Sequence, residues 1–280
     1  MMKMDVIVIG DVNIDLIFYV KNYPGRGTNV ISKRFETHFG GVGANTAVAL
    51  SKMGLNVGLI GTVGRDIWGD LALDDLKKNR VDIALIDRVD RPTGVMVVLV
   101  DKEGERTIIG HRGANEHSRW KSSIKNSIKF VKVLHVSGYT FFNEDLGDLP
   151  IKDMNLAKEA EATTTIDLEG IAHRKELVLK LRNLVDYVFM NQDEARALVD
   201  FVTEEKLERL KEELRAKAVI VKMGGKGCLV FKEKLRKVKP FKVKVVDTTG
   251  AGDAFNSGFI YGIVRGLNLE DSCVLANALA

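Results

Sequence analysis

The sequence contains few cysteines and no long apolar run, and both shortages narrow the class of protein. Its 280 residues include two cysteines, Cys228 and Cys273, which are too few for the disulfide framework of a small secreted domain. No apolar run approaches the roughly 18 residues of a membrane span, and the N-terminal run is too short for a secretory signal. We therefore expect a cytoplasmic protein in a reducing setting, with no membrane partner.

Repeats, low-complexity tracts and long linkers are also missing from the sequence. Its hydrophobic fraction of 45% and charged fraction of 29% are typical of an ordinary globular protein, and its net charge is only +4. The basic stretch 232–244 is the one feature that suggests a nucleic-acid patch. We interpret it instead as a hairpin or sheet edge with its lysines in water, and we expect no nucleic-acid partner.

Apolar runs rich in β-branched residues alternate with amphipathic segments along most of the chain. Such alternation predicts an α/β fold with a mainly parallel sheet and helices on both faces. The predicted strands are 5–11, 57–63, 132–138, 163–168, 187–191 and 218–224. The predicted helices are 43–54, 68–80, 151–161, 175–183, 204–217, 252–265 and a last one from about 269.

Two regions interrupt this alternation. Residues 14–39 and 93–110 each hold two β-rich runs with no helix between them, which is typical of hairpins. They predict a small β-sheet that projects from the main body. We therefore expect an α/β core formed by residues 1–13, 40–92 and 111–280, and a projecting sheet formed by 14–39 and 93–110.

The segment 245–262, VVDTTGAGDAFNSGFIYG, places small residues where a predicted strand gives way to a predicted helix. The first amides of a helix lack an intrahelical acceptor, so Gly250, Ala251 and Gly252 suit the close approach of an anion. Asp253 follows in the first helical turn, and we expect this position to keep its carboxylate ionised and fixed. A carboxylate beside phosphate-binding amides is what phosphoryl transfer to an alcohol requires, because it accepts the hydroxyl proton. The simpler alternative is that Asp253 only complements the helix dipole.

A second glycine-rich segment, FGGVGANTAVAL at 39–50, joins a predicted strand to a predicted helix and is a further candidate for phosphate binding. A tight turn with Asn45 capping the local backbone explains the same glycines. The pattern G-x-G-x-x-G is not met, since Thr46 occupies its last position, and no P-loop sequence occurs. A P-loop nucleotide site is therefore excluded.

Five segments resemble, in sequence and in order, the signature regions of the PfkB, or ribokinase-like, carbohydrate kinases. These segments are GDVNID (10–15), GGVGANTAVALSKMG (40–54), NQDEA (191–195), VKMGGKG (221–227) and DTTGAGDAF (247–255). The resemblance extends over residues 5–280. It implies a ribokinase-like α/β fold with a β-lid, and a kinase that uses Mg²⁺ and ATP. It also implies transfer of the γ-phosphate to a primary hydroxyl of a small sugar or sugar acid.

The resemblance implies roles on the nucleotide side. Asp253 matches the catalytic base, and the Gly-Ala-Gly before it matches the anion hole for the phosphates. Asn191 and Glu194 match the pair that organises Mg²⁺ through its waters; an N-x-x-E sequence is also a helix capping box, and both roles can hold together. For Asn277, near the adenine in relatives, the alternative is an ordinary exposed helical asparagine. The nucleotide-binding residues implied by the resemblance are Asn191, Glu194, Lys222, Gly224, Gly227 and Asn277.

The resemblance also implies a sugar site under the lid. Asn13 and Asp15 match residues that hydrogen-bond substrate hydroxyls, and the alternative for Asp15 is a turn-stabilising role. Arg112 is placed to reach a substrate oxygen or carboxylate, and its alternative is a salt bridge at the base of the lid. The implied substrate-binding residues are Asn13, Asp15, Gly40, Gly41, Asn45 and Arg112. Because lids of this family often mediate dimerisation, we expect a homodimer.

The chain departs from ribokinase itself. Val42 stands where ribokinase tends to have lysine, and no acidic residue stands near Ser137 and Gly138. Asp247 and Thr249 match part of a monovalent-cation loop whose other ligands in relatives follow the final helix, so a K⁺ site is implied only in part. Two alternatives stay open: a nucleoside kinase on the same fold, and a non-catalytic sugar- or nucleotide-binding regulator, which would have no need of a base.

Overall fold

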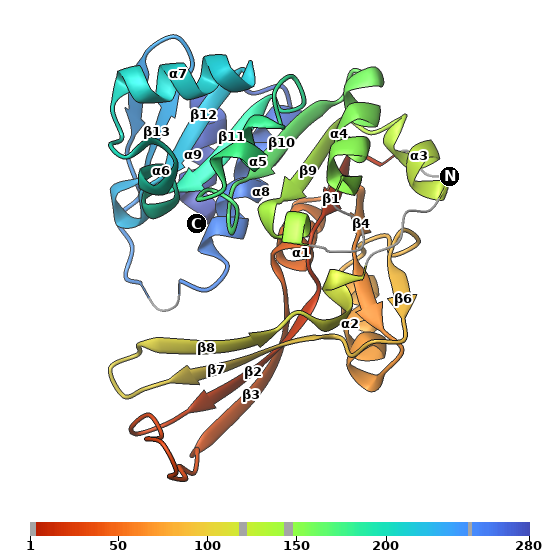
Figure 1. Ribbon diagram of the computed structural model, residues 1–280, viewed down its shortest axis with the longest axis vertical. Helices are drawn as coiled ribbons and strands as arrows, with labels where there is room; N and C mark the ends of the chain where they lie inside the picture. The colour runs from red at the N-terminus through yellow and green to blue at the C-terminus, as the bar shows by residue number, and fades with distance from the viewer. Residues whose placement is uncertain (1–3, 118–121, 143–147, 246–247) are drawn as a thin grey trace.

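An eight-stranded sheet forms the centre of the protein (Figure 1). The structure is a computed structural model that describes residues 4–117, 122–142, 148–245 and 248–280. Six neighbouring strands are parallel, and the last two are antiparallel additions at one edge. In spatial order the strands are β14 (Leu235–Val238), β13 (Cys228–Phe231), β12 (Ala218–Lys222), β11 (Tyr187–Asn191), β10 (Thr163–Asp167), β9 (Val133–Ser137), β1 (Val6–Ile9) and β4 (Val57–Ile60).

Helices cover both faces of this sheet, as the alternation of the sequence predicts. All four residues of β1 are buried, with Val6 and Val8 facing one layer and Ile7 and Ile9 facing the other. The first layer holds α1 (Val42–Lys52), α2 (Ile67–Lys78), α8 (Ala251–Val264) and α9 (Leu269–Leu279). The second holds α3 (Ser122–Ile128), α4 (Leu149–Glu159), α5 (Lys175–Leu179), α6 (Gln192–Val199) and α7 (Glu204–Leu214). No helix in the described part of the chain is long and apolar enough to cross a bilayer.

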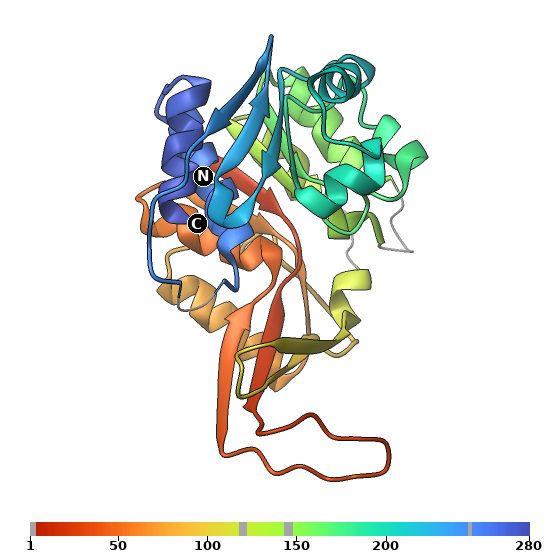
Figure 2. The ribbon, with the colours of Figure 1, turned by 90° about the vertical axis from the view of Figure 1, so that its left-hand side faces the viewer.

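A second sheet of four strands, here called the small sheet, projects from the core (Figures 1 and 2). Its order is β3 (Arg34–Gly40), β2 (Asn13–Tyr19), β7 (Gly94–Val100) and β8 (Arg106–His111). Each of the two regions that interrupt the alternation supplies one antiparallel pair. The two antiparallel pairs are joined into one sheet because β2 pairs in parallel with β7, with Asn13 opposite Gly94.

The element boundaries differ from the prediction where the backbone turns. The predicted strand 57–63 is two strands, because β4 ends at Ile60 and β5 (Thr62–Gly64) leaves the main sheet to pair with β6 (Asp87–Val89). The predicted helix 175–183 ends at Leu179, and Asn183 has a left-handed φ of 66°. The basic stretch 232–244 does include an edge strand, β14.

Candidate active site

A cavity of about 970 Å³ lies between the small sheet and the start of α8. One face of β2 lines it with Asn13 and Asp15, since alternate residues of a strand point to the same side. Arg112 contributes from the base of the small sheet, and Asp253 from the first turn of α8. The structure therefore brings residues from both ends of the chain to one cavity.

The anion site predicted at the start of α8 has the required backbone geometry. The helix begins after Gly250, whose φ of 72° is left-handed and suits glycine, and no side chain caps it. In the described part of the chain, no group accepts from the amides of Gly252 and Asp253. Unpaired amides at the positive end of a helix dipole are a site for phosphate oxygens.

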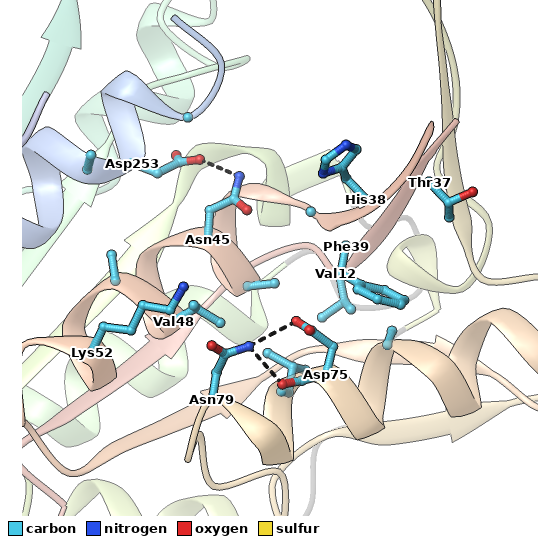
Figure 3. A pocket seen from close by; sticks show the side chains of 17 residues that line it. Val12, Thr37, His38, Phe39, Asn45, Val48, Lys52, Asp75, Asn79 and Asp253 are labelled. Atoms are coloured by element: carbon cyan, nitrogen blue, oxygen red, sulfur yellow. Dashed lines mark hydrogen bonds between the residues drawn. The ribbon is translucent and has the colours of Figure 1, made fainter. Parts of the chain in front are cut away.

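Asp253 is buried, with 7% of its surface exposed, and a hydrogen bond fixes it. The side-chain nitrogen of Asn45 on α1 donates to Asp253 Oδ2 over 2.8 Å, and Figure 3 shows the two side chains pointing toward each other. Burial raises the pKa of Asp253 to about 6, and the charges of Asp167 and Asp15 add to this effect against the opposing Asn45 and Lys222. Burial therefore acts against the ionised state that we expect for this first-turn carboxylate, although an acid with this pKa is mostly ionised at pH 7. A pKa close to the working pH suits a general base.

A buried ion pair lies beneath the anion site. Lys222 at the end of β12 pairs with Asp167 at the end of β10, and Asn256 on α8 donates to Asp167 Oδ2 over 2.7 Å. A Cβ built on Gly252 would lie 3.4 Å from Lys222 Nζ, so the ammonium group is directly under the anion loop. Although burial opposes its charge, Asp167 and Glu169 hold the pKa of Lys222 above its ordinary value. Lys222 is therefore a protonated ammonium group behind the amides, held in place by Asp167.

An acidic group also lies at Ser137, where the sequence shows none nearby. Ser137 Oγ donates to Glu169 Oε1 over 2.7 Å, because the parallel strands β9 and β10 end side by side. Burial, and then the charge of Asp167, raise the pKa of Glu169 well above its ordinary value. The residues Asp167, Glu169 and Asn256 are not among those predicted from the sequence. For Asp167 and Glu169 the available signal was their position just after the β-branched run at 163–166.

Arg112 combines both predicted features, a salt bridge and a place in the cavity wall. Its Nη2 lies 3.0 Å from Asp11 Oδ1, and its guanidinium carbon lies 5.8 Å and 5.6 Å from the ring centres of Tyr139 and Phe142. Burial raises the pKa of Asp11 to about 6 although Arg112 opposes this shift. Arg112 Nε and Nη1 are buried without a hydrogen-bond partner among the described residues.

The second glycine-rich segment divides between two cavities. Gly41, with φ 93°, lines the large cavity beside Val42. Gly40 and Asn45 line a neighbouring pocket of about 460 Å³ that shares Gly250 and Asp253 with the large cavity (Figure 3). Asn45 is therefore placed against the base rather than among the residues that line the large cavity.

The nucleotide-side residues are placed at loop and helix ends. Asn191 Oδ1 accepts from the Glu194 amide over 2.8 Å, and Glu194 Oε2 accepts from the Asn191 amide over 2.7 Å, so the capping box is present. Burial and the charge of Asp167 raise the pKa of Glu194. Gly224 and Gly227 both have positive φ, of 53° and 84°, in the turn after β12.

Asn277 is occupied by structural contacts. Its Nδ2 donates to the carbonyls of Val238 at 3.3 Å and Lys239 at 3.1 Å, and it lies 3.8 Å from Cys228 Sγ. These contacts tie α9 to the segment that follows β14. An adenine contact from Asn277 remains a prediction.

The predicted monovalent-cation pair is only partly visible, because Asp247 lies outside the described residues. Thr249 Oγ1 accepts from Arg106 at the start of β8, and Arg106 Nη2 also donates to Thr248 Oγ1 over 2.7 Å. The tip of the small sheet thus contacts the loop that leads into the anion site. Within the described ranges, no group of three or more His, Cys, Asp and Glu side chains is arranged to hold a metal ion.

Comparison with known proteins identifies the family. The model of the pfkB family carbohydrate kinases matches residues 3–280. A ribokinase of Lactococcus lactis is 30% identical over 274 residues, covering 96% of this chain and 87% of the relative. A nucleoside kinase of Methanocaldococcus jannaschii is 27% identical over 282 residues, covering 97% and 87%. The crystal structure of a Thermotoga maritima ribokinase superposes with a TM-score of 0.83 at 29% identity, covering 98% of this chain and 91% of the other. The chain belongs to the pfkB family of carbohydrate kinases, and it is a phosphotransferase with an alcohol group as acceptor.

Proposed function

We propose that the protein transfers the γ-phosphate of ATP to a primary hydroxyl of a small sugar or sugar acid. The observation that carries this proposal is Asp253, a buried carboxylate beside unpaired amides at the start of α8, in the wall of a large cavity. The cavity opposite Asp253 is lined by Asp15 and Asn13, which are suited to bind hydroxyl groups. A base, an anion site and a polyol site are the parts that phosphoryl transfer to an alcohol requires.

The reaction follows from this arrangement. Asp253 takes the proton of the sugar hydroxyl, whose oxygen forms a bond to the γ-phosphorus as the bond to the ADP oxygen breaks. The amides of Gly252 and Asp253 stabilise the charge on the transferring group, and Lys222 adds a fixed positive charge from below. The small sheet acts as the lid that keeps water from the reacting oxygen.

A magnesium ion would be held through its waters by Asn191 and Glu194. Glu194 uses Oε2 in the capping box, and its Oε1 has no partner in the described part of the chain. A single open carboxylate oxygen fits a hydrated Mg²⁺, which keeps several of its waters. The ion would neutralise charge on the phosphates of ATP. A K⁺ ion at Asp247 and Thr249 stays a prediction of the sequence.

A sugar or sugar acid is favoured as the acceptor by Arg112, whose buried nitrogens suit an oxygen-rich ligand. A nucleoside is the second candidate, because Tyr19 and Tyr139 line the same cavity and offer rings for a base to stack on. The relatives include both a ribokinase and a nucleoside kinase. Use of ATP agrees with the cytoplasmic setting expected from the cysteine content.

A homodimer would form through the small sheet. The face opposite the cavity carries Phe18, Val97 and Leu99, together with Phe35 and Ile109, which are 53% and 65% exposed. A second copy of the sheet would bury this apolar face. Light scattering should give a dimer mass for the parent and a monomer mass for Ile109→Glu, and a monomeric parent at micromolar concentration would contradict the dimer.

A substrate panel tests the proposed function. The protein is mixed with Mg²⁺ and ATP and offered ribose, fructose, 2-keto-3-deoxygluconate, adenosine and hexose phosphates, and ADP release is measured. We expect turnover of a free sugar or sugar acid. A specificity constant for adenosine at least about tenfold above every sugar would make the protein a nucleoside kinase. Sugar binding without ADP release would instead support the non-catalytic regulator.

A further inference from the structure

The orientation of the Asn115 side chain is fixed by a backbone group. Asn115 is buried in the short helix η1 (Gly113–Glu116) at the base of the small sheet. The amide of Val12 lies 2.9 Å from Asn115 Oδ1. Because a backbone N–H can only donate, the atom that faces the Val12 amide must be the oxygen of Asn115 and not its nitrogen.

This orientation decides how Asn13 is turned. Asn115 Nδ2 donates to Asn13 Oδ1 over 2.8 Å, and it also lies within 3.2 Å of the Val12 and Arg112 carbonyls. The oxygen of Asn13 is therefore engaged away from the cavity, and its nitrogen is the atom left for a ligand. Asn13 lines the cavity, and no described residue accepts from its Nδ2.

The neighbouring strand leaves room for this pair of amides. Gly94 stands opposite Asn13 in the parallel register of β2 and β7. A Cβ on Gly94 would collide with Asn13 Oδ1 and with Asn115 Nδ2. Any side chain at position 94 would push the two amides apart, so the glycine preserves their contact.

We propose that Asn115 is a positioning residue that holds Asn13 with its nitrogen in the sugar cavity. The subsite at Asn13 then binds a ligand oxygen that accepts a hydrogen bond, such as a ring oxygen, a carbonyl or a carboxylate. Asp15, on the same face of β2, binds a hydroxyl that donates. The cavity thus requires a hydrogen-bond acceptor of the ligand at Asn13 and a hydrogen-bond donor of the ligand at Asp15. This assignment rests on the proposed function for the identity of the ligand as a sugar.

The pair Asn13→Asp and Asn13→Ala tests which atom faces the cavity. In Asn13→Asp one new oxygen keeps the bond from Asn115, and the other presents an acceptor where the nitrogen was. At pH 8 with a neutral sugar we expect its KM to rise about 10- to 100-fold in Asn13→Asp, at least as much as in Asn13→Ala. The KM for ATP should stay within about threefold. Asn13→Asp close to the parent, with Asn13→Ala impaired, would overturn the proposal.

Asn115→Asp tests the positioning role from outside the cavity wall. It keeps an oxygen toward Val12 and replaces the nitrogen that faces Asn13, so Asn13 must rotate and turn its own oxygen to the cavity. We expect the sugar KM to rise at least about tenfold, while kcat and the KM for ATP stay within about threefold. An unchanged sugar KM in the folded variant would contradict the proposal.

The unfolding temperature separates this proposal from the proposed function. If the Asn115 nitrogen faced the Val12 amide, Asn115→Asp would relieve a clash of two donors, and the variant would unfold at a higher temperature than the parent. A temperature at or below that of the parent is expected instead, whether or not any sugar is turned over. The parent is assayed on ribose and 2-keto-3-deoxygluconate, with adenosine as the third probe, and absence of turnover on all three would overturn only the proposed function.

Discussion

Asn45 on α1 and Asp253 on α8 are joined by a 2.8 Å hydrogen bond, and this bond fixes the candidate base from the neighbouring smaller pocket. The two residues belong to the two glycine-rich segments of the sequence. Each helix begins at a glycine of positive φ, Gly41 and Gly250. The two glycine-rich segments of the sequence therefore meet at Asp253, and Gly41 and Gly250 both line the large cavity.

Asp253→Asn should fold and bind ATP but lose the base. Turnover should fall by about 10²- to 10⁴-fold, the usual contribution of a positioned base. Steady-state ADP release measures this loss, and ATP affinity by calorimetry is the control. Turnover within about threefold of the parent would remove Asp253 from the mechanism.

The same substitution should stabilise the protein at neutral pH. Folding raises the pKa of Asp253 from 3.8 to about 6, so the folded state holds this proton more tightly, and stability falls as pH rises across that interval. Asp253→Asn removes the penalty of about 2–3 kcal/mol. Thermal unfolding should show a higher midpoint than the parent at pH 7–8, with the difference vanishing near pH 4. If the midpoint difference between Asp253→Asn and the parent instead grew on acidification, the predicted fall of stability with rising pH would be contradicted.

Asn45→Ala should shift the pH dependence of turnover. The Asn45 amide stabilises the ionised form of Asp253, so its loss raises the pKa of Asp253 further. The acid limb of the kcat profile, expected near pH 6 in the parent, should move to higher pH. Lys52→Ala, an exposed change on the same helix, is the control and should leave the limb in place.

Asp15→Ala should weaken sugar binding and leave ATP binding nearly unchanged. Asp15 lines the cavity, none of the described residues donates a hydrogen bond to its carboxylate, and burial raises its pKa. Loss of a charged hydrogen-bond acceptor should reduce sugar affinity by about 1.5–3 kcal/mol. Calorimetric titration with each ligand separates the two effects, and an equal loss for ATP would show a structural role.

Arg106→Ala should loosen the tip of the small sheet. Arg106 donates to the hydroxyls of Thr248 and Thr249, which precede the anion site. Without these bonds, amide hydrogen exchange at 101–106 should become faster than in the parent. Arg26→Ala, in the β2–β3 connection, is the matched control. Unchanged exchange at 101–106 would show that the contact does not hold the tip.

The parts of the site that are local in the chain could be predicted from the sequence. The Gly-Ala-Gly turn before Asp253 and the capping box of Asn191 and Glu194 each lie within a few residues, where helix-start chemistry alone determines the geometry. The mainly parallel sheet could also be predicted, because strands that alternate with amphipathic helices along the chain are typical of such a sheet.

The parts that depend on distant segments could not be predicted. The ion pair of Asp167 and Lys222 requires that β10 and β12 lie on either side of β11. The residue pattern of a strand does not show which other strands it will pair with. Likewise the contact between Asn13 and Asn115 depends on how the small sheet joins the core. Burial of Asp253, which sets its pKa, also results from packing rather than from its place in the helix.

The parallel pairing of β2 with β7 affects how the protein folds. The chain from β3 to β6 lies between these strands, so their hydrogen bonds close a long loop. Pairings that are distant in sequence form late, because loop-closure entropy opposes them until the intervening chain is ordered. We therefore expect the small sheet to be completed after that part of the core. During refolding, the circular-dichroism signal of the helices should return before enzymatic activity. The reason is that the side of the cavity formed by the small sheet is absent until β2 and β7 pair.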